Sequence, residues 1–178
     1  MSFPHNYNRI ISGIILRVKL FLGAEHQKRS TELEEITMEN SRIAVRYFSK
    51  SGNTKKLADV IAKTAGCVAE SIPVPVNGNV DILFLGASVY WGGISSEVKA
   101  YIQTLDKDKI GRVVVFSTSA LAERAFPQVQ KILQDKGIQV DTENFYCRGE
   151  FTALHKGRPN QDDLDAAKKF TSEILERK

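Results

Sequence analysis

The sequence predicts a three-layer, doubly wound α/β sandwich built on a five-stranded parallel sheet. From residue 38 onward, strand-like runs alternate five times with segments of helical periodicity. Parallel strands need crossover connections, and helices on both faces of the sheet supply them. Two of the runs, 81–87 and 112–116, are apolar almost throughout, as strands that are covered on both faces should be.

The first unit starts with the β-rich run from Ile43 to Phe48. It continues through a polar loop into a helix over residues 55–66, where apolar residues recur at helical spacing. The next run, 67–76, is a weaker strand that contains two prolines. Because proline cannot donate to a sheet ladder, we expect this second strand at an edge of the sheet.

The other strand–helix units follow, separated by short stretches that contain Gly, Pro or Asn. The run 81–87 reads as a central strand, and Gly137 is placed to end a helix in the left-handed conformation. Three aspartates lie in the first turns of the last helix, where negative charge suits the helix dipole. The remaining predicted elements are helix 97–105, strand 112–116, helix 125–136, strand 139–147 and a helix that starts near Asn160.

The N-terminal part lacks the strand–helix pattern, so we expect a leader over residues 1–37 and one domain over residues 38–178. The apolar run 10–22 is interrupted by polar and charged residues and is shorter than the ~20 residues needed to cross a bilayer. As a basic amphipathic helix it can contact a membrane surface or a partner protein. The alternative is that Met38 is the true start, because residues 33–38 back-translate to a bacterial ribosome-binding site before an ATG.

Composition excludes several classes of function. The net charge of +4 is mild, and the basic residues are dispersed rather than clustered as in nucleic-acid-binding proteins. Cys67 and Cys147 are far apart and belong to no CxxC or Cys/His cluster, so neither a zinc site nor a disulfide framework is predicted. We expect a cytoplasmic protein that binds no nucleic acid and no metal.

The loop after the first strand carries residues that suit a phosphate. Hydroxyl and amide side chains, a glycine and the N–H groups at the start of a helix together form a cradle for an anion. The alternative is that these residues only cap the helix. This predicted phosphate loop comprises Ser49, Lys50, Ser51, Gly52, Asn53 and Thr54.

The segment YFSKSGNTKKLA resembles the signature of the flavodoxin family, a first strand followed by Ser/Thr-x-Thr-Gly-x-Thr and a helix, with Ser51 where threonine is more usual. The resemblance runs from Arg42 to the C-terminus, matches the short-chain form, and includes Cys-x-Gly-x-Phe at 147–151 and Gly-x-Pro-Asn at 157–160. It implies the strand order 2-1-3-4-5 and a non-covalent FMN. The implied phosphate ligands are Ser49, Ser51, Asn53 and Thr54, while Lys50 either pairs with the phosphate or points into water.

A second loop follows the third strand and places Tyr90 and Trp91 beside two glycines. Aromatic planes beside permissive backbone suit a flat isoalloxazine ring, and the resemblance implies that a peptide of this loop contacts flavin N5. For one of the two aromatics, the alternative is that it packs the loop against the domain. The expected ring loop contains Ser88, Val89, Tyr90, Trp91, Gly92 and Gly93.

A third loop, with Ser117, Thr118 and Ser119, stands where flavodoxins bond the pyrimidine edge of the ring. No aromatic follows until Phe126, so we expect the second stacking aromatic of well-known carriers to be missing and one flavin face to be more open. Residues 38–178 carry 20 Lys and Arg against 17 Asp and Glu. Flavodoxin carriers are typically acidic where they dock on basic reductases, so this balance also leaves room for an enzyme.

Three functions are compatible with these features, and the first is preferred. It is an FMN-binding electron carrier that exchanges electrons with a redox partner protein. The second is an FMN-dependent oxidoreductase of the quinone reductase or protoporphyrinogen oxidase type, acting on a small planar quinone or tetrapyrrole. The third is an interaction domain that kept the fold without a flavin. A phospho-receiver is excluded, because Ser49 and Ser88 stand where it needs acidic residues.

Two further residues are assigned no chemistry. His155 precedes the last helix, and we expect it on the surface. Cys147 ends a predicted strand, where a lone cysteine usually behaves as a small buried apolar side chain. No residue of the chain is assigned a catalytic role.

Overall fold

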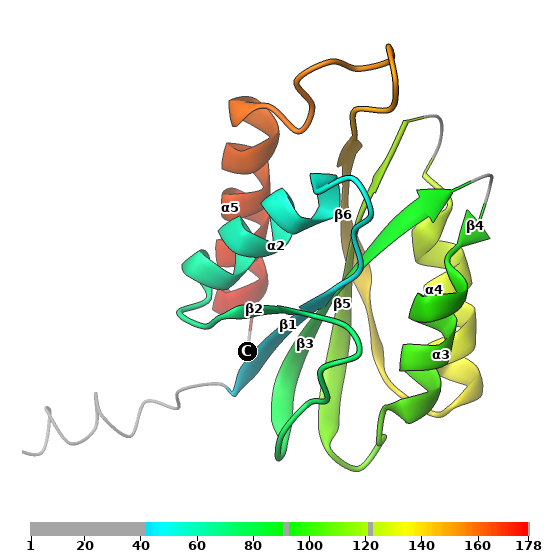
Figure 1. Cartoon of the computed structure of the whole chain (residues 1–178). Coiled ribbons are helices and arrows are strands. Elements are labelled where there is room, and N and C mark those ends of the chain that lie inside the picture. The colour runs from blue at the N-terminus through cyan, green and yellow to red at the C-terminus, as the bar shows by residue number, and fades with distance from the viewer. Residues whose placement is uncertain (1–41, 91–92, 121–122, 178) are drawn as a thin grey trace, which may run out of the picture. The chain divides into compact units, whose positions relative to one another are not determined.

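The computed structural model describes residues 42–90, 93–120 and 123–177, which form an α/β sandwich (Figure 1). In these ranges no helix is long and apolar enough to cross a membrane. The predicted leader, residues 1–37, lies outside the described residues. The strands are β1 (Ile43–Tyr47), β2 (Ala69–Ser71), β3 (Val80–Tyr90), β4 (Gly93–Ile94), β5 (Ile110–Ser119) and β6 (Val140–Arg148), and the helices are α2 (Asn53–Thr64), α3 (Ser96–Thr104), α4 (Ala125–Asp135) and α5 (Gln161–Glu176).

Five strands form a parallel sheet in the order β2-β1-β3-β5-β6. The two-residue strand β4 lies off this path and pairs antiparallel with the end of β3. With β4 set aside, the predicted order 2-1-3-4-5 is confirmed. Strand β2 is at an edge, also as predicted, and the proline-containing segment after it is bound by Arg46, which donates to Val74 O and Pro75 O at 3.0 and 2.7 Å.

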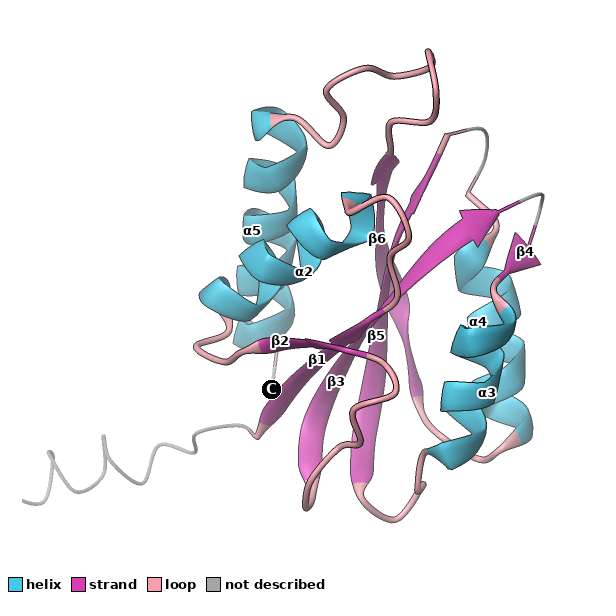
Figure 2. Ribbon diagram, in the orientation of Figure 1, coloured by secondary structure: helices cyan, strands magenta, loops and turns pink. Residues whose placement is uncertain are grey.

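Helices cover both faces of the sheet, α2 and α5 on one side and α3 and α4 on the other (Figure 2). Successive residues of a strand point to opposite faces. Along β3, Leu83 and Leu85 therefore pack in the core on the α3 and α4 side, and Ile82 and Phe84 in the core on the α2 and α5 side. Because all four side chains are buried, this stretch of sequence is apolar on both faces.

Two strands run further than the sequence predicts. Strand β3 continues through Tyr90 and β5 through Ser119, so Ser88 and Ser117 lie in strands rather than in the expected loops. The parallel pairing of β3 with β5 extends to Ser88 and Thr118. Continued backbone pairing thus outweighs the polar side chains that indicated a loop, and these residues sit on the rigid sheet.

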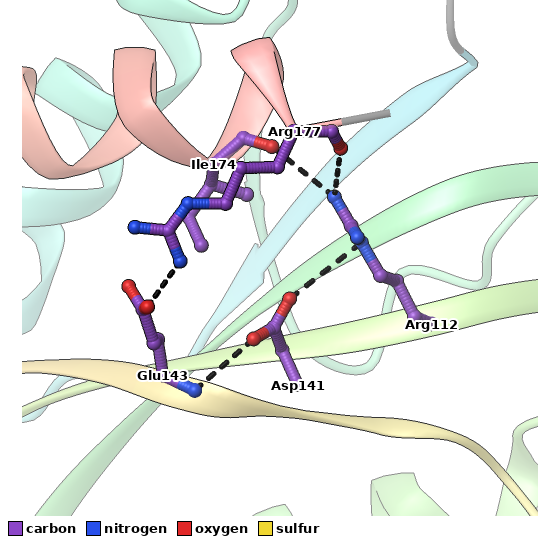
Figure 3. Close-up of polar contacts among 5 residues, drawn as sticks. All are labelled: Arg112, Asp141, Glu143, Ile174 and Arg177. Atoms are coloured by element: carbon purple, nitrogen blue, oxygen red, sulfur yellow. Dashed lines mark hydrogen bonds and ion pairs between the residues drawn. The ribbon is translucent and has the colours of Figure 1, made fainter.

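Arg112 on β5 ties the C-terminal end of α5 to the sheet (Figure 3). Its Nη2 atom donates to the carbonyl oxygens of Ile174 and Arg177 at 3.1 and 3.3 Å, and its Nε lies 3.7 Å from Asp141 Oδ2. Beside this cluster Arg177 pairs with Glu143. A cation at the C-terminus of a helix satisfies carbonyls that have no partner within the helix and complements the helix dipole.

Replacing Arg112 with methionine is expected to lower the free energy of unfolding by about 1–2 kcal/mol, because two carbonyls and a carboxylate lose a charged partner. Chemical denaturation followed by circular dichroism measures the change. Lys99→Met is the matched control, because Lys99 is exposed on α3 and its loss should cost less than about 0.5 kcal/mol. Equal losses in the two variants would contradict the role assigned to Arg112.

Candidate functional site

The phosphate loop connects β1 to the N-terminus of α2 at the carboxyl edge of the sheet. Gly52 precedes the helix in the left-handed conformation, with φ of 86°, which side chains other than glycine's rarely adopt. No side chain caps α2, so the N–H groups of its first turn have no partner within the helix. The N-cap position itself is occupied by Gly52, which has no side chain that could accept from these groups.

The first turn of α2 contains no acidic residue, and Lys55 and Lys56 are the third and fourth residues of this helix. A helix N-terminus carries a partial positive charge and is stabilised by acidic side chains or bound anions. Lys55 pairs with Asp59 one turn later, at 2.7 Å. An anion bound at the N-terminus would supply the negative charge that the first turn lacks.

The hydroxyl of Ser49, the first residue of this loop, is buried and has no hydrogen-bond partner among the described residues. An unpaired buried polar group costs about 1–3 kcal/mol. The loop therefore holds a hydroxyl and backbone N–H groups that can donate, and a phosphate has oxygens that accept. Lys50 and Ser51 are exposed. The Lys50 ammonium lies 5.8 Å from the centre of the Phe48 ring.

Three hydroxyls, one from each predicted binding segment, meet inside the domain. Thr54 Oγ1 lies 2.7 Å from Ser88 Oγ and 2.8 Å from Thr118 Oγ1. Ser88 Oγ also donates to the carbonyl oxygen of Phe48 at 2.8 Å. The exposed fractions of Thr54, Ser88 and Thr118 are 0%, 4% and 4%. The structure thus brings the phosphate loop together with the ends of β3 and β5.

The predicted ring loop folds as a hairpin, because β4 turns back on the end of β3. From α4, the Gln128 side-chain oxygen accepts from the N–H of Ile94 at 3.2 Å and holds β4 in place. Trp91 and Gly92, and the side chain of Tyr90, lie outside the described residues, so the stacking aromatic stays a prediction. The hairpin pairs Val89 with Ile94 and Tyr90 with Gly93.

The end of β5 is buried and is hydrogen-bonded by β6 and by the residue that follows β6. Ser117, Thr118 and Ser119 are 1%, 4% and 6% exposed. The carbonyl of Ser119 accepts from the N–H of Gly149 at 3.2 Å and from the Tyr146 hydroxyl at 3.3 Å. If residues 117–119 contact a ligand, they therefore do so at the carboxyl edge of the sheet, where β5 ends.

No binding role was predicted for residues 149–160, between β6 and α5, yet this segment contacts the phosphate loop. The Asn53 side-chain nitrogen donates to the carbonyl of Glu150 at 2.8 Å. A Cβ at Gly149 would lie 2.9 Å from that nitrogen and 3.3 Å from Thr118 Cβ, so only glycine allows this close approach. Gly149, inside the Cys-x-Gly-x-Phe element, is the signal in the sequence that points to the segment.

An exposed apolar pair stands at the tip of the same segment. The backbones of Phe151 and Leu154 pair across a tight turn, and their exposed fractions are 46% and 47%. Just beyond the tip, His155 is exposed, as predicted, and its Nε2 lies 2.9 Å from Ala120 O. Two hydrogen bonds therefore flank the tip. On one side Glu150 bonds Asn53 of the phosphate loop, and on the other His155 bonds Ala120, which follows β5.

Cys147 is a buried apolar side chain, as predicted, and burial raises the pKa of its thiol to about 12. At pH 8 only about one thiol in ten thousand is ionised with such a pKa. We expect iodoacetamide to modify Cys147 in folded protein at least a hundredfold more slowly than in protein unfolded in guanidinium, as measured by mass spectrometry of the peptide. Equal rates would show that the thiol is accessible and ionisable.

Comparison with known proteins agrees with the fold. A family model described as a flavodoxin domain matches residues 44–169. An uncharacterised protein of Methanocaldococcus jannaschii is 26% identical over 137 residues, which are 69% of this chain and 90% of that one.

Solved structures share the architecture at low identity. Flavodoxin 2 from Bacillus cereus superposes with a TM-score of 0.58 at 18% identity, over 77% of this chain and 99% of that chain. Rubredoxin oxygen:oxidoreductase from Desulfovibrio gigas gives a TM-score of 0.59 at 15% identity, over 76% of this chain. This chain covers only 35% of that enzyme. On the match of the family model and on its fold, the chain belongs to the flavodoxin family.

Proposed function

We propose that residues 38–178 form a domain that binds FMN and exchanges electrons with a redox partner protein. The observation that carries the proposal is the unpartnered, buried hydroxyl of Ser49 before an uncapped helix N-terminus without an acidic residue. The phosphate of FMN would accept from this hydroxyl and from the N–H groups of the first turn of α2. It would also supply the negative charge that this end of the helix lacks.

The proposed ligands divide between the phosphate and the ring. Ser49 would hold the phosphate through its hydroxyl, and Gly52, Asn53 and Thr54 through the backbone. The hairpin of β3 and β4 and the end of β5 would flank the ring. When bound, the flavin supplies one- and two-electron transfer, and the protein contributes binding, orientation and electrostatics. Both cysteines in the described ranges are free, which supports the further proposal of a reducing, cytoplasmic location.

Flavin titrations test the binding site. Flavin-stripped protein is titrated with FMN and with riboflavin, which lacks the phosphate, and binding is followed by flavin fluorescence. We expect FMN to bind at least a hundredfold more tightly than riboflavin. Equal affinities would contradict the phosphate site, and no binding of either flavin would support an interaction domain that kept the fold alone.

Stepwise anaerobic reduction of the FMN-loaded protein separates a carrier from an enzyme. A stabilised one-electron state, with no direct oxidation of NAD(P)H, is the result expected of an electron carrier. Steady NAD(P)H oxidation with an added quinone would instead support the oxidoreductase.

The exposed pair Phe151 and Leu154 favours this second candidate function, an oxidoreductase acting on a planar apolar quinone or tetrapyrrole. Apolar side chains exposed beside a binding site gain free energy when a flat apolar molecule covers them. If the domain is such an enzyme, changing both residues to serine should raise KM for the quinone about tenfold and leave kcat within twofold. Val68→Ser is the matched control, because Val68 is exposed but lies before β2, away from the site. An unchanged KM in the double variant would remove the support for this function.

A further inference from the structure

The hydroxyls of Thr54, Ser88 and Thr118 form a chain whose direction is set by the backbone. A hydroxyl has one proton to donate and two lone pairs that accept. Ser88 donates its proton to the carbonyl of Phe48, so in its contact with Thr54 it must accept. Thr54 therefore donates to Ser88, and Thr118 donates to Thr54. Each of the three protons is thus already used inside the domain.

This direction decides what the chain can offer a ligand. With its protons committed, each hydroxyl presents only lone pairs, and the oxygens of a phosphate dianion need donors. If the three hydroxyls donated in the opposite direction, Ser88 would donate to Thr54, and the carbonyl oxygen of Phe48 would lose the hydrogen bond from Ser88. The hydroxyls of Thr54, Ser88 and Thr118 are consequently poorly suited to bind a phosphate, in contrast to the unpartnered hydroxyl of Ser49.

The chain also links three elements that are far apart in the sequence. Thr54 lies in the first turn of α2, Ser88 near the end of β3 and Thr118 near the end of β5. These are the elements that carry the phosphate loop and the two segments proposed to flank the ring. Buried hydrogen bonds of this kind hold their partners in one arrangement, because breaking one leaves a polar group unpaired.

We propose that these hydroxyls are positioning groups: they lock the phosphate loop to both ring-binding segments before the flavin binds and do not themselves contact the cofactor. The proposal rests on the proposed function and revises the direct cofactor contacts expected for Ser88 and for the side chains of Thr54 and Thr118. It makes the phosphate and ring halves of the site depend on each other.

Thr118→Val tests the proposal, because valine has nearly the shape of threonine and lacks the hydroxyl. The Kd values for FMN and for riboflavin are measured in wild-type and variant protein. Loosening of the whole site should raise both Kd values by a similar factor, about tenfold. In flavin-free protein, amide hydrogen exchange in residues 49–54 should become several-fold faster. Thr118→Ser, which keeps the hydroxyl, should restore wild-type values in both measurements.

Thr171→Val is the matched control. Thr171 is 0% exposed, and its hydroxyl donates to Ala167 O within α5 at 2.8 Å. The variant therefore also loses one buried hydrogen bond made by a hydroxyl, but not one of those that join Thr54, Ser88 and Thr118. It should leave both Kd values within twofold of wild type.

Two results would overturn the proposal. A rise in the Kd of FMN alone, with riboflavin unchanged, would make Thr118 a direct phosphate ligand. Unchanged Kd values for both flavins, together with unchanged amide exchange at residues 49–54, would show that the three hydroxyls are ordinary core groups and do not position the phosphate loop. Ser88→Ala is measured in parallel, so that a folding defect in one variant does not decide the outcome. If wild-type protein binds no flavin, the proposed function fails, and the exchange measurement still tests the locking of the loop.

Discussion

Replacing Gly52 with valine is expected to raise the Kd of FMN about tenfold or more, within a range of about 5- to 150-fold. Gly52 has φ of 86°, and nothing lies within 4 Å of the position that a Cβ would take. The damage therefore comes from the backbone and not from a clash. Holding a β-branched residue in the left-handed conformation costs on the order of 1–3 kcal/mol, and about 1.4 kcal/mol corresponds to a factor of ten in affinity. Fluorescence titration of the flavin-stripped variant measures the change.

Gly52→Asn is the control for this prediction. Asparagine enters the left-handed region more readily than other residues with a side chain, so it should keep the Kd within about threefold. Equal losses in the valine and asparagine variants would show that the backbone conformation of Gly52 is not what the phosphate loop requires.

Replacing Gly86 with alanine is expected to lower the free energy of unfolding by about 3 kcal/mol. Gly86 lies on the central strand β3, and a Cβ there would be 2.4 and 2.6 Å from ring atoms of Phe116 and 2.8 Å from Tyr47 Cβ. None of these atoms can move without disturbing the core on the α2 and α5 side. Against a total stability of about 5–15 kcal/mol, this loss is large, and denaturant titration measures it.

Gly78→Ala separates the effect of a clash from that of the backbone. Gly78 has φ of 70° with nothing within 4 Å, so alanine should cost only about 1–2 kcal/mol. Shortening the clashing ring with Phe116→Leu in the Gly86→Ala background should recover part of the lost stability. A cost at Gly86 no greater than at Gly78 would contradict the packing argument.

The architecture was predictable because its signals are local and repeated. The apolar run 81–87 is buried on both faces, and the alternation of strands with helices leaves few ways to connect a parallel sheet. The signature around Gly52 likewise predicted a loop before a helix, and the structure confirms it. The prolines in 67–76 correctly predicted an edge strand.

The lengths of β3 and β5 were not predictable in the same way. Ser88 and Thr118 are polar, and polar residues after an apolar run usually indicate a loop. Their place in the sheet depends on a partner strand that is distant in the sequence. Propensity is a weak guide where such pairing decides the outcome.

The loop between the first strand and the first helix of the domain, the doubly wound order of the sheet and the family could be predicted from the sequence, because a strand, a glycine and a helix start lie within a dozen neighbouring residues. Only the tertiary structure decided what the hydroxyls do. Ser49 is left with a free donor, while Thr54 is joined to two residues 34 and 64 positions away. Nor does the sequence show that residues 149–160 reach the loop through Asn53. These pairings depend on how the sheet places distant strand ends side by side.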